Sequence, residues 1–124
     1  MYFLRTSLAQ SRFFRYNVSE FRMLEVLTMR SLEESRAAID AVDREIVRLF
    51  EKRMTIARDV AAYKIAAGLP VLDRSREAQV LESRTAMLQD PCWAESIRAL
   101  YEAVMAISRA EQEKLLRAAE EGQL

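Results

Sequence analysis

The chain has 124 residues, room for one ordinary domain, and is 51% apolar and 31% charged. Nineteen basic residues balance nineteen acidic ones, so the charge gives no sign of binding to nucleic acid or an acidic membrane surface. Two glycines and two prolines disfavour an all-β fold, and the lack of histidine excludes a histidine base and imidazole metal sites.

Residues 1–31 differ from the rest of the chain. They carry five arginines, two glutamates and many aromatic residues without a clean period. An organellar leader has a similar composition, but we interpret the segment as a poorly ordered extension or an upstream start before Met29. The single cysteine, Cys92, excludes an internal disulfide and fits a reducing compartment, so we expect a cytoplasmic protein. No run of 18 apolar residues predicts a membrane span.

A very long helix is predicted from Ser31 to Ala67. Ser31 is a plausible N-cap, glutamates occupy the first turn, and Gly68 and Pro70 stop the pattern. The helix would be about 54 Å long, whereas a small domain is only about 30 Å across. Its apolar residues recur three and four apart, at Ile39, Val42, Ile46, Leu49, Ile56, Val60 and Tyr63. Such a seam would stay in water unless a second chain covered it, which predicts an intertwined homodimer.

Arg53 interrupts this apolar seam. An unpaired guanidinium there would cost several kcal/mol, so it needs an anion or water. A local acid such as Glu51 or Asp59 is one candidate partner, and a role in fixing dimer register is another. Lys64 lies eleven residues on, about 20° away in direction and roughly 16 Å further along the helix. The two cations could therefore converge on a small dianion.

Arg36 precedes Arg53 by 17 residues, which is about 25 Å along the helix and about 100° away in direction. It cannot serve the same pocket in the same chain. In a symmetric dimer with antiparallel long helices it could reach the partner's pocket. The ordinary interpretation of Arg36 or Lys64 alone is solvated surface charge.

Two further helices are predicted, over about 73–89 and about 92–119, separated by Asp90-Pro91. The fold class is therefore all-α, with three helices in a domain over 32–119 and a short tail at 120–124. The third helix carries apolar residues at Trp93, Ile97, Leu100, Val104, Ile107 and Leu115.

Polar residues with helical spacing accompany these two helices. Asp73, Arg76 and Glu77 share one face of a helix start, where Asp73 is a plausible N-cap and Glu77 could pair with Arg76 or a lysine. Ser108 and Gln112, four residues apart, interrupt an apolar face of the third helix. Such a pair is usually half-exposed surface, unless that face closes over the cations.

The ordered set of these elements resembles the all-helical (AroQ) class of chorismate mutases. Its parts are an arginine near the helix start, "IDxxDxxIVxLFxxR", a lysine eleven residues later, and "PVxDxxRE", followed by the serine and glutamine of the last helix. The resemblance covers about residues 32–118. Each part alone is a weak signal, whereas the whole set with these spacings is specific.

The resemblance implies a three-helix subunit in an intertwined dimer whose two sites each borrow an arginine. Arg36 of the partner subunit and Arg53 would hold the two carboxylates of chorismate, assisted by Ser108. Lys64 and Gln112 would donate to the ether oxygen. Glu77 would accept the ring hydroxyl, the Asp73 backbone would line the pocket, and Arg76 would position the substrate-binding groups.

The implied reaction is the rearrangement of chorismate to prephenate in phenylalanine and tyrosine biosynthesis, which needs no cofactor or metal. It requires orientation of one molecule and stabilisation of charge on an oxygen. An isochorismate-pyruvate lyase of the same fold is an alternative, disfavoured because the Asp73, Arg76 and Glu77 pattern is intact. A non-catalytic helical dimer is a further alternative, but it would not explain Arg53 in the seam.

Overall fold

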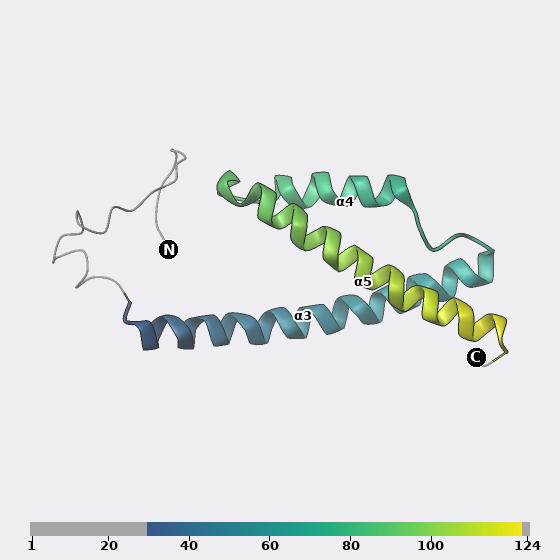
Figure 1. Cartoon of the computed structure of the whole chain (residues 1–124), viewed down its shortest axis with the longest axis horizontal. Helices are drawn as coiled ribbons and strands as arrows, with labels where there is room; N and C mark the ends of the chain where they lie inside the picture. Colours follow the sequence, from purple (N-terminus) through teal and green to yellow (C-terminus); the bar gives the residue numbers. More distant parts are fainter. Residues whose placement is uncertain (1–29, 123–124) are drawn as a thin grey trace. The chain divides into compact units, whose positions relative to one another are not determined.

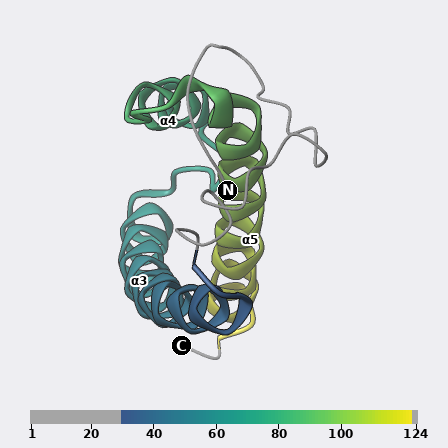
Figure 2. The same ribbon diagram turned by 90° about the vertical axis from the view of Figure 1, so that its left-hand side faces the viewer.

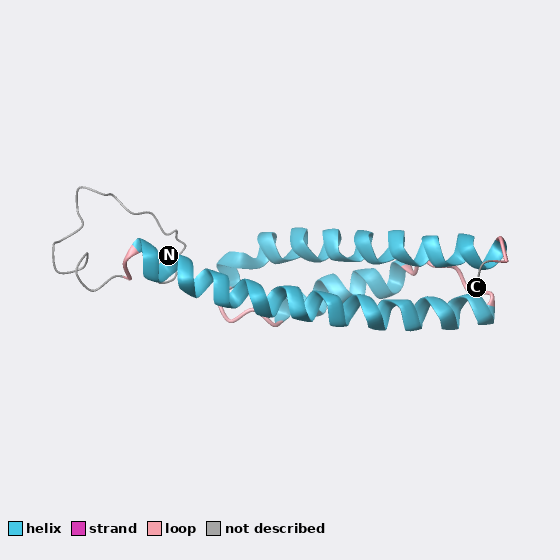
Figure 3. Cartoon of the chain, turned by 90° about the horizontal axis from the view of Figure 1, so that it is seen from below, coloured by secondary structure: helices cyan, strands magenta, loops and turns pink. Residues whose placement is uncertain are grey.

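The computed structural model describes residues 30–122. All the regular secondary structure within this range is helical (Figure 3). The expectation of a poorly ordered extension falls almost wholly on residues outside this range. The chain divides into two units, an N-terminal unit, Met1–Phe50, and a C-terminal unit, Glu51–Leu124. None of the helices in the described part of the chain is long and apolar enough to cross a membrane.

Helix α3, Leu32–Ala67, has the predicted bounds and contains 36 residues (Figure 1). At its start, the Ser31 hydroxyl accepts a 3.0 Å hydrogen bond from the Glu34 backbone N–H, and Glu34 Oε1 accepts one of 2.9 Å from the Ser31 N–H. This reciprocal capping box fixes the first turn. At the other end, Gly68 has a φ of +70°, a conformation that glycine adopts readily and other residues rarely.

Helix α4, Arg74–Ala86, begins where the sequence predicts and ends three residues before the predicted boundary at 89. Its N-cap is Asp73, whose Oδ1 accepts a 2.9 Å hydrogen bond from the Arg76 backbone N–H. This bond satisfies one of the N–H groups that a helix start leaves without a partner.

The third predicted helix has two parts. A 3₁₀ turn, η2, spans Pro91–Trp93 and is capped by Asp90, whose Oδ1 accepts a 2.9 Å hydrogen bond from the Cys92 N–H. Helix α5, Ala94–Glu120, follows it directly. The prediction of three helices is therefore confirmed for the described residues.

Within the C-terminal unit, α4 packs beside the N-terminal part of α5, and the last turns of α3 lie beside its later part (Figures 1 and 2). The interior is small. Its buried apolar side chains, among the residues described, are Ala57, Ala61, Val71, Val80 and Met105.

One apolar stripe, which begins at the last residue of η2 and continues along α5, faces away from this interior. Trp93, Leu100 and Ile107 follow one another at intervals of seven residues and are 58%, 54% and 45% exposed. The face of α5 buried within the chain contains Met105 together with the polar residues Ser108 and Gln112. The chain therefore buries a partly polar face of α5 and leaves an apolar stripe exposed.

Candidate active site

A cavity of about 290 Å³ lies within the C-terminal unit. This volume is at the lower end of the roughly 300–1,000 Å³ typical of ligand pockets, so it suits a small ligand. Three segments form its wall: α3, α4 with the connection before it, and α5. The lining residues are Arg53, Ile56, Ala57, Val60, Lys64, Val71, Asp73, Arg76, Glu77, Val80, Arg84, Met105, Ser108, Arg109 and Gln112.

The cavity wall is strongly cationic although the whole chain has no net charge. Five of its side chains are basic and only two are acidic: Arg53, Lys64, Arg76, Arg84 and Arg109 against Asp73 and Glu77. Such a concentration of positive charge in a partly buried pocket favours an anionic ligand with more than one negative group.

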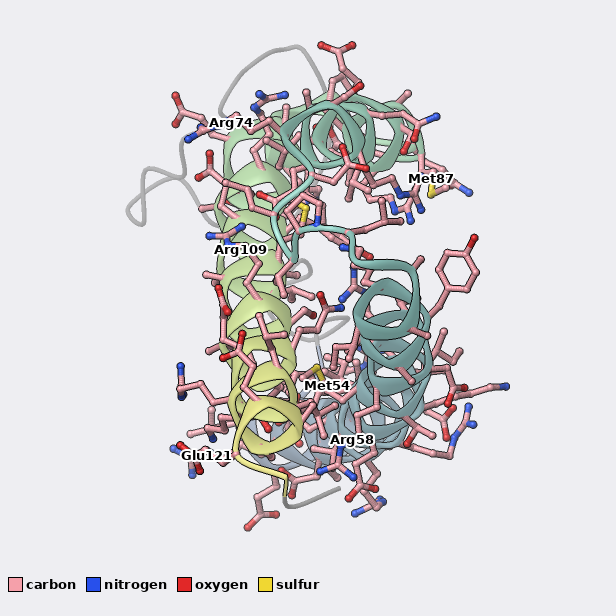
Figure 4. The ribbon with its side chains drawn as sticks, turned by 90° about the vertical axis from the view of Figure 1, so that its right-hand side faces the viewer. Met54, Arg58, Arg74, Met87, Arg109 and Glu121 are labelled. Carbon is pink, nitrogen blue, oxygen red and sulfur yellow. The ribbon has the colours of Figure 1, made fainter. Side chains whose placement is uncertain are left out.

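Arg53 connects α3 to α5. Its Nη1 donates a 2.9 Å hydrogen bond to the Ser108 hydroxyl, which itself lies 3.7 Å from the sulfur of Met54. Figure 4 shows Met54 between the two helices. No ion pair joins Arg53 to Glu51 or Asp59 in the described part of the chain, so the expected local-acid partner is not observed.

Lys64 and Gln112 are each anchored to a backbone carbonyl. Lys64 Nζ donates to the Val71 oxygen at 2.6 Å, and Gln112 Nε2 donates to the Ala57 oxygen at 3.1 Å. An ammonium has three N–H bonds and a primary amide has two, so each group retains donor capacity after making its anchoring bond. Gln112 is only 7% exposed and Ser108 only 8%, so both are buried and not the half-exposed surface residues that are usual at this spacing.

The partner of Glu77 differs from both candidates that the sequence offers. Arg76 uses its Nη1 to donate to Gln79 Oε1 at 2.6 Å, and Lys64 is bound elsewhere. Glu77 instead pairs with Arg109, whose Nη1 lies 2.5 Å from each of its carboxylate oxygens. Pairing with Arg76 or a lysine was the wrong expectation because the crossing of α4 and α5 brings Arg109 into reach.

Two charged residues of the cavity wall were not among the predicted site residues, Arg84 and Arg109. Arg84 lies 5.9 Å from the ring centroid of Tyr101 and donates to the Ser83 hydroxyl at 2.8 Å. Arg109 directly follows Ser108, and this adjacency was the available signal. It is weak, because neighbouring helix positions point about 100° apart and do not usually share a site.

Arg36 is the one predicted site residue that is not among the cavity-lining residues. It is exposed and belongs to the N-terminal unit, whereas the cavity lies wholly in the C-terminal unit. The other seven predicted residues line the one cavity: Arg53, Lys64, Asp73, Arg76, Glu77, Ser108 and Gln112. Over residues 30–122, no cluster of cysteine, aspartate and glutamate side chains is placed to hold a metal ion.

Residues 35–113 match the family model described as chorismate mutase type II. The chain is 38% identical over 56 residues to the T-protein of Haemophilus influenzae, covering 45% of this chain and 15% of that protein. It is 35% identical over 54 residues to the chorismate mutase of Methanocaldococcus jannaschii, covering 44% of this chain and 54% of the relative.

A 46-residue segment is 48% identical to part of the 3-dehydroquinate dehydratase of Pyrobaculum aerophilum, covering 37% of this chain and 15% of that protein. These matches span from about a seventh to about half of each relative. No solved structure matches the chain significantly. The family model covers well over half of the 124 residues, and the chain therefore belongs to the chorismate mutase type II family.

Proposed function

We propose that this protein converts chorismate to prephenate, the intramolecular rearrangement that feeds phenylalanine and tyrosine biosynthesis. The observation that carries the proposal is the cationic cavity in which Arg53, Lys64 and Gln112 meet from two helices. A cavity with these donors suits a small dicarboxylate that has an ether oxygen between its two halves. Family membership supports the same activity.

In this proposal Arg53 binds one substrate carboxylate, with Ser108 held beside it by their mutual hydrogen bond. Lys64 and Gln112 donate to the ether oxygen with the N–H bonds not used for anchoring. Glu77 accepts the hydrogen bond of the ring hydroxyl. The Asp73 backbone lines the pocket, and Arg76 positions the groups around it.

The rearrangement requires two things from the protein: orientation of the substrate and stabilisation of the charge that develops on its ether oxygen. The substrate must fold its side chain over the ring, which is an orientation effect that can lower a barrier by several kcal/mol. As the carbon–oxygen bond breaks, negative charge grows on the ether oxygen. Donors fixed at that position stabilise it, and losing one such donor typically costs about 3–4 kcal/mol. No step requires a nucleophile, a histidine base or a cofactor.

We also propose that the active form is an intertwined homodimer in which Arg36 of the partner subunit completes each site. The apolar seam on the N-terminal unit supports this, because Ile39, Val42 and Ile46 are each 57% exposed in the single chain. The apolar stripe of Trp93, Leu100 and Ile107 on η2 and α5 supports it as well. Contiguous exposed apolar surface of this kind marks an interaction site.

An isochorismate-pyruvate lyase remains the second candidate, since it would use the same cationic residues. The presence of Asp73, Arg76 and Glu77 in the cavity wall favours the mutase. The decisive experiment follows the disappearance of chorismate and the formation of prephenate with the purified full chain. Isochorismate is supplied in a parallel reaction. A wild-type protein that consumes no chorismate would refute the proposal, and pyruvate release from isochorismate alone would favour the lyase.

A further inference from the structure

Arg109 and Glu77 form an ion pair in the cavity wall that joins α5 to α4. The Glu77 side chain is 25% exposed and that of Arg109 is 36% exposed, so both lie at the margin of the cavity. Arg109 lies on α5, in the turn that contains Ser108 and Gln112 (Figure 4). The pair therefore links α5, one position after Ser108, to the start of α4.

The geometry of the pair restrains the carboxylate without using all of its acceptor capacity. A single nitrogen, Nη1 of Arg109, is shared between the two oxygens of Glu77. A carboxylate has about four lone-pair positions, so further acceptor capacity is left. One of these positions can accept a hydrogen bond from a ligand's hydroxyl group while Arg109 stays in place.

The charges of Glu77 and Arg109 also affect the binding of an anionic ligand. Glu77 is an acidic group in a cavity that is otherwise suited to anions, and an unpaired carboxylate there would repel a dianionic ligand. Arg109 neutralises this charge locally. The remaining cations, including Arg53 and Lys64, then act on the ligand without opposition from Glu77.

We propose that Arg109 is a positioning residue, which holds the Glu77 carboxylate aimed at the ring hydroxyl of the substrate and offsets its repulsion of the substrate's carboxylates. The inference rests on the proposed mutase function. It assigns Arg109 an effect that passes through Glu77, without contact to the substrate. The competing interpretation is that Arg109 binds a substrate carboxylate itself.

A double-mutant cycle separates the two interpretations, because an effect that passes through Glu77 disappears when that carboxylate is absent. We measure kcat and KM for conversion of chorismate in wild type, Arg109→Met, Glu77→Gln and the double variant. In the wild-type background Arg109→Met should lower kcat by about 10- to 100-fold and raise KM. In the Glu77→Gln background, where glutamine can still accept from a hydroxyl, the same change should alter kcat less than about twofold.

Two further variants guard against a purely structural effect. Arg109→Lys retains a cation that can bridge both oxygens and should recover kcat to within about tenfold of wild type. Arg98→Met, on the exposed surface of α5 and outside the cavity wall, should leave kcat unchanged. Thermal melting of each variant shows whether it is folded. If Arg109→Met does not fold, Arg109→Lys and Arg109→Gln take its place in the cycle.

The outcomes are distinct. Equal losses of kcat in both backgrounds would show direct action on the substrate and overturn the inference, and so would an Arg109→Met protein with wild-type kcat. Both results leave the mutase proposal standing. A folded wild-type protein without mutase activity overturns the proposed function, and the inference with it.

Discussion

The Arg53 guanidinium donates a 2.9 Å hydrogen bond to the hydroxyl of Ser108, 55 positions further along the chain. This bond explains how α3 accommodates a permanent charge in an otherwise apolar stripe. A guanidinium has five N–H donors, and the serine uses one of them. The cavity provides the space in which the others can meet a carboxylate.

Replacing Arg53 with methionine should abolish most of the mutase activity. Methionine keeps much of the side-chain volume but loses a charged hydrogen-bonding group, so we expect kcat/KM to fall by at least about 100-fold. Arg53→Lys should lie between wild type and methionine, because a lysine keeps the charge but not the two-pronged geometry. Arg58→Met is the matched control, since Arg58 is exposed on α3 and does not line the cavity. An Arg53→Met enzyme with near-normal kcat/KM would exclude the proposed carboxylate contact.

Mixing two inactive variants tests whether the sites are shared between chains. Arg36→Ala removes the residue that a chain would supply to its partner's site. Lys64→Ala removes a residue that a chain supplies to its own site. A mixed dimer should therefore hold one whole site and one doubly damaged site. After random exchange in an equal mixture, half of the dimers are mixed, so activity should recover to about a quarter of wild type. Chain exchange is verified with differently tagged subunits. Exchange without recovery would mean that each site is built from a single chain.

Substituting Gln112 with glutamate should make the activity depend on acid. An amide donates at any pH, so the wild type should keep its turnover through neutral and mildly alkaline pH. A glutamate donates only when protonated, so the variant should lose kcat as pH rises through the pKa of the new carboxyl. Position 112 is buried, and the Ala57 carbonyl accepts there, so that pKa should lie above the ordinary glutamate value.

The pH profiles of both proteins decide the matter. A sharp loss of wild-type kcat above about pH 5, close to the ordinary carboxyl pKa of about 4.3, would argue against Gln112 as the ether donor. Identical profile shapes for wild type and variant would argue the same way.

Placing a charge in the apolar seam of α3 should weaken the proposed dimer. Ile46→Glu would bury a carboxylate in each subunit of a symmetric interface, so the dimer dissociation constant should rise by at least about 100-fold. Arg44→Glu adds a carboxylate about 160° away on the same helix and should leave the dimer intact. Sedimentation over a range of protein concentrations measures both constants. A monomeric wild type, or an Ile46→Glu protein that stays dimeric, would contradict the proposed interface.

Local signals in the sequence were sufficient to predict the three helices and most of their boundaries. The three-four period, the serine cap at Ser31 and the glycine at Gly68 set the bounds of α3, and Asp73 set the start of α4. Each of these acts through the backbone hydrogen bonds of its own turn, so no knowledge of tertiary packing is needed. The end of α4 was placed three residues too late because no glycine or proline stops the helix at Ala86.

Some residues of the site could also be predicted from the sequence. Helical geometry puts Arg53 and Lys64 on a common face, and it does the same for Ser108 and Gln112. The Arg109–Glu77 pair was not accessible, because its partners are 32 positions apart on helices whose crossing is set by packing. The sequence alone offered several cations for Glu77, and only the arrangement of α4 against α5 selects one.

The hydrogen bond from Lys64 to Val71 has a kinetic consequence. It joins the last turn of α3 to the fourth of the six residues between α3 and α4, and the Val71 side chain is buried in the cavity wall. Any opening of this connection that withdraws Val71 also frees the Lys64 ammonium to water. In the proposed mutase, a ligand that enters by that route would meet the Lys64 ammonium in its proposed position only after the connection has closed again. Amide hydrogen exchange at Leu69, Val71 and Leu72 should accordingly slow when a ligand binds.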